Sequence, residues 1–104
     1  MALVSLRIPA LSAALVILFA SPAAAQRADL ARARTLYNER QFDGAIEAAT
    51  LAQKTPATLD AATVVLARAH LERYRERANP DDLSAARNAL GTVRVRLAIC
   101  MSEP

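Results

Sequence analysis

Residues 33–52, ARTLYNERQFDGAIEAATLA, carry the pattern that decides the fold. Leu30, Ala33 and Tyr37 follow one another at spacings of three and four residues, which places them on one face of a helix. A second helix follows, and its matching face consists of Phe42, Ala45, Ala49 and Ala52. Because only residues 38–41 connect the two, the pattern predicts that the helices fold back antiparallel as a helical hairpin.

The same pattern recurs further along the chain. Shifted by 34 residues, the first helix matches a third one, in which Leu30, Ala33, Arg34 and Tyr37 correspond to Val64, Ala67, Arg68 and Leu71. Shifted by 41 residues, the second helix matches a fourth one, with Leu83, Ala86, Leu90 and Val93 at the corresponding positions. The two shifts differ by an insertion of seven residues, almost two helical turns, within residues 72–82. We therefore expect a lengthened third helix, from about Leu59 to Ala78, whose apolar face continues through Tyr74 and Ala78.

The sequence NPDD at residues 79–82 has the composition of a helix start. Asn79 is suited to accept a hydrogen bond from the first free backbone N–H groups, and Pro80 fits the first helical turn. Asp81 and Asp82 then face the positive end of the helix dipole. We interpret the two carboxylates as helix-start charges, with a paired-carboxylate or cation site as the alternative.

Charges of both signs alternate near the end of the third helix. Arg68 precedes Glu72 by four residues and Arg73 precedes Glu76 by three, so we expect both pairs to lie as neighbours on the solvent-facing side. The alternatives are a ligand-binding arginine cluster and a membrane-surface patch, formed by Arg68, Arg73, Arg75 and Arg77. The interspersed glutamates argue against both alternatives.

A period of about 34 residues built from two antiparallel helices resembles the tetratricopeptide-repeat family. The resemblance covers about residues 28–93 and rests on small or aromatic residues at four of the family's positions, Ala33, Phe42, Ala45 and Ala52. The chain departs from the family at further positions: Leu36 and Ala49 replace aromatics, Arg40 replaces a glycine, and Pro56 lies beside the repeat-ending proline position. His70 takes an aromatic position in the second repeat.

This resemblance implies an all-α fold of two antiparallel helical hairpins of a tetratricopeptide-like solenoid, the second hairpin lengthened by about two turns. It also implies a groove, lined by the first helix of each repeat, that binds another protein. Because such motifs are degenerate, they indicate a fold more directly than a function.

Residues 1–25 have the order of regions found in a secretory signal peptide. Arg7 precedes an uncharged, largely apolar stretch, residues 8–20, and small residues then lead to a cleavage point near Ala25. Cleavage predicts a periplasmic or secreted domain, residues 26–104, without a stable membrane span, because the apolar stretch is short for a spanning helix. The alternative is an uncleaved N-terminal anchor.

The charge balance argues against a nucleic-acid partner. The chain has 13 basic and 10 acidic residues and a formal net charge of +3, and residues 1–25 contain only one of these charges. A nearly balanced chain has no strong positive field, and an exported protein meets little nucleic acid. We therefore expect a protein partner.

Few side chains are candidates for site chemistry. His70 is the only histidine and Cys100 the only cysteine, which excludes an internal disulfide and a metal site built on two histidines. We expect His70 to be a packed, hydrogen-bonded histidine in the middle of a helix. For Cys100 the alternatives are an intermolecular disulfide and a buried apolar residue, and we favour the second. The sequence thus predicts no catalytic, cofactor-binding or metal residues, no cofactor and no enzymatic activity.

The last helix is expected to leave apolar surface uncovered. Two repeats are present where about three normally stabilise such a fold, and Leu90, Val93, Leu97 and Cys100 fit one helical face. We expect this helix to continue to about Ile99, with an alternating strand as the alternative. We consider three alternatives for what covers this face: another copy of the chain, another protein, or a further C-terminal region of a truncated repeat protein.

Two functional hypotheses follow. The first is an exported helical-repeat protein that acts as a protein–protein interaction module or adaptor in the bacterial cell envelope. The second is a structural, self-assembling role, in which the uncovered last helix pairs with a copy of itself and Cys100 links the homodimer.

Overall fold

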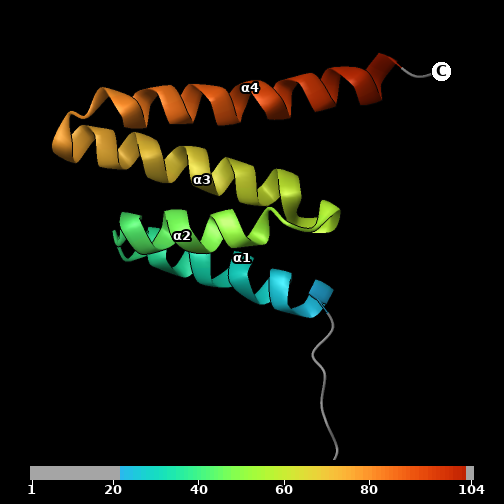
Figure 1. The fold of residues 1–104 in the computed structure, drawn as a ribbon, viewed down its shortest axis with the longest axis horizontal. Helices are drawn as coiled ribbons and strands as arrows, with labels where there is room; N and C mark the ends of the chain where they lie inside the picture. The colour runs from blue at the N-terminus through green and yellow to red at the C-terminus, as the bar shows by residue number, and fades with distance from the viewer. Residues whose placement is uncertain (1–21, 103–104) are drawn as a thin grey trace, which may run out of the picture.

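The computed structural model describes residues 22–102, which form a chain of α-helices (Figure 1). In order they are α1 (Pro22–Asn38), α2 (Phe42–Ala52), α3 (Pro56–Arg77) and α4 (Pro80–Ser102). Each helix runs back along the one before it, and none of these residues forms a β-strand. The prediction of an all-α fold is confirmed.

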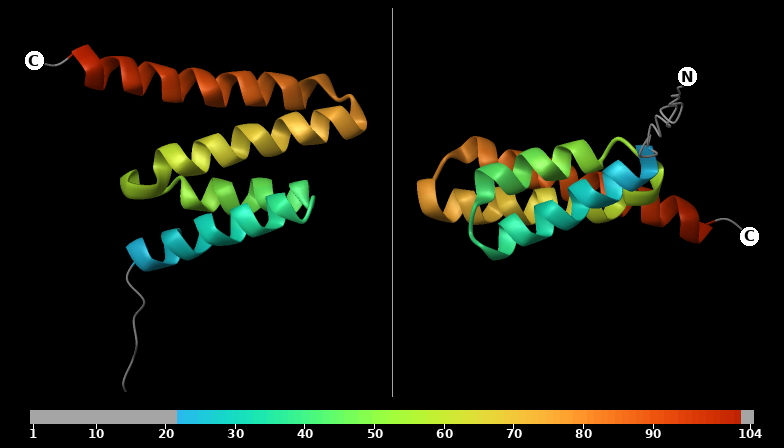
Figure 2. Two further views of the ribbon diagram at one scale, coloured as in Figure 1. Left: turned by 180° about the vertical axis from the view of Figure 1, so that it is seen from behind. Right: turned by 90° about the horizontal axis from the view of Figure 1, so that it is seen from below.

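The helices stack in one direction, and this order decides which faces are buried. Neighbours in sequence pack together throughout, and α1 in addition contacts α3. Within the described part of the chain, α4 packs against α3 alone. The left view of Figure 2 shows from behind that α4 lies at the outer end of the stack. Most of the circumference of α4 is therefore open.

The second hairpin is longer than the first, as the insertion predicts. Helices α3 and α4 have 22 and 23 residues, whereas α1 and α2 have 17 and 11. Helix α3 ends at Arg77, one residue before the predicted end, and α4 continues to Ser102, three residues beyond the predicted end. Continuous helix through residues 80–102 excludes the alternative of a strand in this segment.

Both hairpin connections place a non-glycine residue in the left-handed region of backbone conformation. Arg40 has a φ of 62° between α1 and α2, and Ala78 has a φ of 54° between α3 and α4. The backbone N–H of Ala78 donates to the carbonyl of Tyr74 at 2.7 Å, which ends α3. The side chain of Asn79 then accepts a hydrogen bond from the N–H of Asp81 at 2.9 Å, which confirms Asn79 as the N-cap of α4.

The core lies between α1, α2 and α3 and consists largely of alanine. It contains Leu30 and Val65 together with the fully buried Ala33, Ala48, Ala49, Ala52 and Ala62. A smaller cluster combines Phe42 with Ala45 and Ala69. Alanine side chains let the three helices approach closely, and their burial removes apolar surface from water. The apolar faces predicted for the first hairpin are confirmed, with Tyr37 only partly buried.

The apolar face predicted for the third helix is wrong in part. Of its members, Ala67 is buried, but Val64 is 36% exposed and Ala78 lies on the surface. The neighbouring Val65 is buried instead, together with Ala62. The reason is that α3 has α1 and α2 on one side and α4 on another, so it buries two faces and not a single stripe.

The predicted signal peptide falls mainly on residues 1–21, outside the described residues. Its last four residues, 22–25, lie in the first turn of α1. No helix within residues 22–102 is both long and apolar enough to cross a membrane.

Candidate functional site

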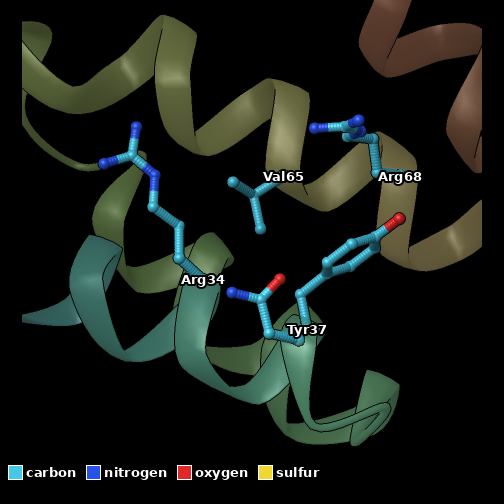
Figure 3. Close-up of a pocket in the computed structure, with 5 residues that line it drawn as sticks. Arg34, Tyr37, Val65 and Arg68 are labelled. Atoms are coloured by element: carbon cyan, nitrogen blue, oxygen red, sulfur yellow. The ribbon is translucent and has the colours of Figure 1, made fainter.

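A pocket of about 320 Å³ lies between α1 and α3 (Figure 3). It is lined by Arg34, Tyr37, Asn38, Val65 and Arg68. Figure 3 shows Arg34 and Tyr37 rising from α1 toward α3, with Val65 between them. The pocket therefore sits in the groove that the first helices of the two repeats were predicted to line.

The helical repeat explains why these residues meet. Arg34 and Tyr37 are three residues apart on α1, and Val65 and Arg68 are three apart on α3, so each pair shares one helix face. Arg34 and Arg68 also occupy equivalent positions, because the first helices are related by a shift of 34 residues. Each repeat thus contributes one arginine to the same groove.

The aromatic ring of Tyr37 is held by two contacts. The guanidinium carbon of Arg68 lies 5.8 Å from the centre of this ring, within the range of a cation–π interaction. The ring of Phe42 meets it edge-on, with 5.6 Å between ring centres and an interplanar angle of 63°. Tyr37 is therefore fixed between the core and the groove.

The groove carries positive charge without a neutralising partner. Arg34 and Arg68 are exposed, and no carboxylate lines the pocket. Among the ion pairs of the described residues, none involves either arginine. Two arginines that face solvent over a tyrosine and a valine favour a ligand with both an anionic group and an apolar part.

A second polar cluster joins α2, α3 and α4. Its centre is Arg73, which donates hydrogen bonds to Asp82 at 2.6 to 3.1 Å and to Asp43 at 2.9 Å. Arg77 donates to the other oxygen of Asp43 at 3.0 Å. The Nδ1 atom of His70 is hydrogen-bonded to Asp82 at 2.9 Å, which confirms His70 as a packed, hydrogen-bonded histidine.

These contacts correct the ion pairs predicted for the third helix. Arg73 turns toward α2 and α4 and does not pair with Glu76. Glu76 instead pairs with Arg40 at 3.2 Å, and Glu72 pairs with Arg75 at 3.0 Å, not with Arg68. For Arg73 and Glu76 the reason is that neighbouring segments of the chain bring oppositely charged side chains within reach. Glu72 keeps a partner within α3, but it is the arginine three residues further along.

The interpretation of Asp82 as a helix-start charge is likewise incomplete. Its side chain is 4% exposed and lies between α4 and α3. Hydrogen bonds from Arg73 hold the pKa of Asp82 below its usual range, although burial acts in the opposite direction. A hydrogen bond from Arg77, and to a smaller extent one from Arg73, lowers the pKa of Asp43. Hydrogen bonds to Asp82 and Asp43 raise the pKa of Arg73.

This second cluster is a structural junction. Each of its charged groups has a hydrogen-bonded partner within the protein, whereas Arg34 and Arg68 of the groove take part in none of the ion pairs of the described residues. The described residues also contain no grouping of three or more His, Cys, Asp or Glu side chains that could hold a metal ion. The α1–α3 groove is therefore the better candidate for a functional site.

The structure keeps Cys100 away from His70 and exposes it. Arg96 pairs with Asp60 near the start of α3, and Cys100 lies one turn further toward the end of α4. His70 contacts Asp82 at the start of α4, so the two side chains lie at opposite ends of the hairpin. The prediction of a buried Cys100 is wrong, because α4 has only α3 to pack against.

Comparison with models of known protein families, with curated protein sequences and with solved structures finds no match to this chain. The resemblance to tetratricopeptide repeats therefore stays a prediction.

Proposed function

We propose that this protein is an exported helical-repeat protein that binds another protein through the α1–α3 groove. It acts as an interaction module or adaptor in the bacterial cell envelope. The observation that carries the proposal is the pair of equivalent arginines, Arg34 and Arg68, that flank Tyr37 in a pocket without a carboxylate. An extended protein segment that presents a carboxylate beside an apolar side chain satisfies this pocket.

The order of regions in residues 1–25 supports the envelope location. Export is tested separately from binding. Cell fractionation is expected to place the protein in the periplasm or the medium, and mass spectrometry of the recovered protein is expected to find Gln26 as its first residue. Recovery from the membrane with residues 1–25 intact would show an N-terminal anchor and contradict the predicted cleavage.

The binding proposal is tested with immobilised protein and an envelope extract. The variant Arg34→Ala/Arg68→Ala removes both groove charges, and Arg32→Ala/Lys54→Ala removes the same charge from exposed positions outside the pocket. We expect a specific protein to be retained by the wild type and by the control variant and to be lost with the groove variant. Circular dichroism establishes that all three are equally helical. Retention that is the same for all three proteins would refute a role of the groove.

A further inference from the structure

The outer surface of α4 carries an unusual amount of exposed apolar side chain. Among residues 22–102, the exposed large apolar side chains are Val64, Leu90, Val95, Leu97, Ile99 and Met101, and all but one of these belong to α4. Figure 1 shows that no other helix lies on the far side of α4. Leu90 and Leu97 are seven residues apart and so lie on one side of α4, and exposed apolar side chains that lie together mark a site of contact with a protein or a membrane.

The internal repeat indicates what kind of element fits this surface. Leu90 corresponds to Ala49, and Val64 corresponds to Leu30. In the first repeat both positions are buried, at 0% and 8% exposure, in a cluster that Ala62 and Val65 of α3 complete. In the second repeat Leu90 is 44% exposed. The uncovered surface of α4 is thus equivalent to one that a helix covers in the first repeat.

The alignment of α3 along α4 in the second hairpin agrees with this equivalence. The ion pairs Arg73–Asp82 and Asp60–Arg96 fix α3 against α4 near both ends. They place Val64 and Leu90 at the same level of the hairpin. A helix in the equivalent place would therefore meet both side chains, as α3 meets the first repeat.

The charges around this surface all have one sign. From residue 83 to residue 102, α4 contains Arg87, Arg94 and Arg96 and no acidic residue. Arg96 pairs with Asp60, but within the described chain Arg87 and Arg94 take part in no ion pair. These two arginines, with Leu90 and Gly91, line a shallow groove of about 280 Å³.

Gly91 presents backbone without a side chain in this groove. A Cβ atom added at Gly91 meets no other atom within 4 Å, so the backbone of α4 is accessible at this point. A partner backbone can therefore approach closely between the two arginines.

We propose that the surface formed by Arg87, Leu90, Gly91, Arg94 and Leu97, called here the α4 face, binds an amphipathic helix of another protein. That helix carries leucine-type residues along one stripe and acidic residues beside it. The apolar stripe covers the two leucines, and the acidic side chains pair with the two free arginines. The pocket at this site shares no lining residue with the pocket of the α1–α3 groove.

A second copy of the chain is a poorer occupant of the α4 face. If two α4 helices pack antiparallel about the middle of this face, near residue 92, Arg94 of each copy lies opposite Leu90 of the other, and no carboxylate reaches either arginine because residues 83–102 contain none. Helix α2 carries Asp43 and Glu47 and no basic residue, but its apolar face is buried within its own chain. Charge complementarity therefore favours an acidic helix from a different protein.

The test uses protein expressed from its full-length sequence and two labelled synthetic peptides. Both peptides are amphipathic helices with the same leucine stripe, one flanked by glutamate and the other by lysine. Fluorescence anisotropy at low salt is expected to show that the glutamate-flanked peptide binds at least about tenfold more tightly, since two exposed ion pairs contribute to its binding. The variant Arg87→Glu/Arg94→Glu is expected to reverse the preference.

Two controls connect the result to the α4 face. Arg32→Glu/Lys54→Glu changes the net charge by the same amount at exposed positions outside both sites and is expected to leave the preference intact, even if the α1–α3 groove proves to have no function. Leu97→Ser is expected to weaken the glutamate-flanked peptide without a change in helicity by circular dichroism. Equal binding of both peptides, or a preference that the Arg32→Glu/Lys54→Glu control abolishes, would overturn the proposal. The proposal would also be overturned if sedimentation showed a dimer that binds neither peptide and that the Leu97→Ser substitution dissociates.

Discussion

Arg73 in α3 holds the carboxylate of Asp82 in α4 with three hydrogen bonds, two from Nε at 3.0 and 3.1 Å and one from Nη2 at 2.6 Å. The same guanidinium donates to Asp43 in α2 at 2.9 Å. One side chain therefore connects three helices. Arg73 makes this connection near the turn of the second hairpin, beside the lengthened segment. Apolar packing is sparse there, because only Asp82 and Ala86 of α4 are buried.

Replacement of Asp82 by alanine is expected to destabilise the protein by about 3 kcal/mol. The change leaves Arg73 and His70 without the acceptor that they share, and the loss of one partner of a buried ion pair is costly. Asp81→Ala is the matched control, because Asp81 is exposed in the same helical turn, and we expect it to cost only about 0.5 kcal/mol. Urea unfolding followed by circular dichroism measures both. Equal costs would mean that the ion pair contributes little beyond the helix dipole.

The stability of the fold is expected to decrease in acid. The pKa of Asp82 is lowered by Arg73 in the folded state, so between that pKa and the unfolded value of about 3.9 the unfolded chain binds more protons. The stabilisation is complete above about pH 5 and is lost as the pH falls through the folded pKa. Asp82→Asn is expected to flatten this dependence. If the free energy of unfolding decreased equally in the wild type and in Asp82→Asn below pH 4, other carboxylates would be responsible for the acid sensitivity.

The first hairpin was predictable because two local signals agree. The apolar spacing fixes the buried faces of α1 and α2, and the short connection allows only an antiparallel return. The insertion of seven residues likewise predicted a longer α3, since almost two turns bring the helix back to nearly the same face. The pair Arg34 and Arg68 in the α1–α3 groove was visible in the sequence as one match of the 34-residue shift.

The partners of Arg73 and the exposure of Val64 and Cys100 could not be predicted in the same way. They depend on which helices flank α3 and α4, and a single helix pattern does not contain that information. One signal for Asp82 was present. Asp82 precedes the buried Ala86 by four residues, so it shares the face of α4 that meets α3.

Ala78→Gly is expected to stabilise the protein by about 1 kcal/mol. Ala78 is exposed and adopts a left-handed conformation with a φ of 54°, which glycine tolerates without the steric cost of a Cβ atom. Arg40→Gly relieves the same kind of strain at a φ of 62° but loses the ion pair with Glu76 and the contact with Phe42. We therefore expect a smaller gain from it. Thermal unfolding compares the two variants, and a loss of stability in Ala78→Gly would contradict the prediction.

Cys100 is expected to react with a thiol reagent in the folded protein at a rate within about tenfold of that in the urea-unfolded chain, because it is exposed. Labelling is followed by mass spectrometry at several protein concentrations. Strong protection that appears only at high concentration would indicate that copies of the chain cover the end of α4. Protection at every concentration would contradict the exposed position.

The two glycines of the chain are expected to respond differently to replacement by alanine. Alanine has a higher helix propensity than glycine by about 1 kcal/mol, and both positions lie within helices. At Gly91 the new Cβ meets nothing within 4 Å, so Gly91→Ala is expected to realise most of that gain. At Gly44 it would lie 3.2 Å from Cδ1 of Leu36, so Leu36 must shift and the gain is smaller or lost. Chemical unfolding of both variants measures the difference. Equal stabilisation would mean that α1 and α2 pack less closely than the structure shows.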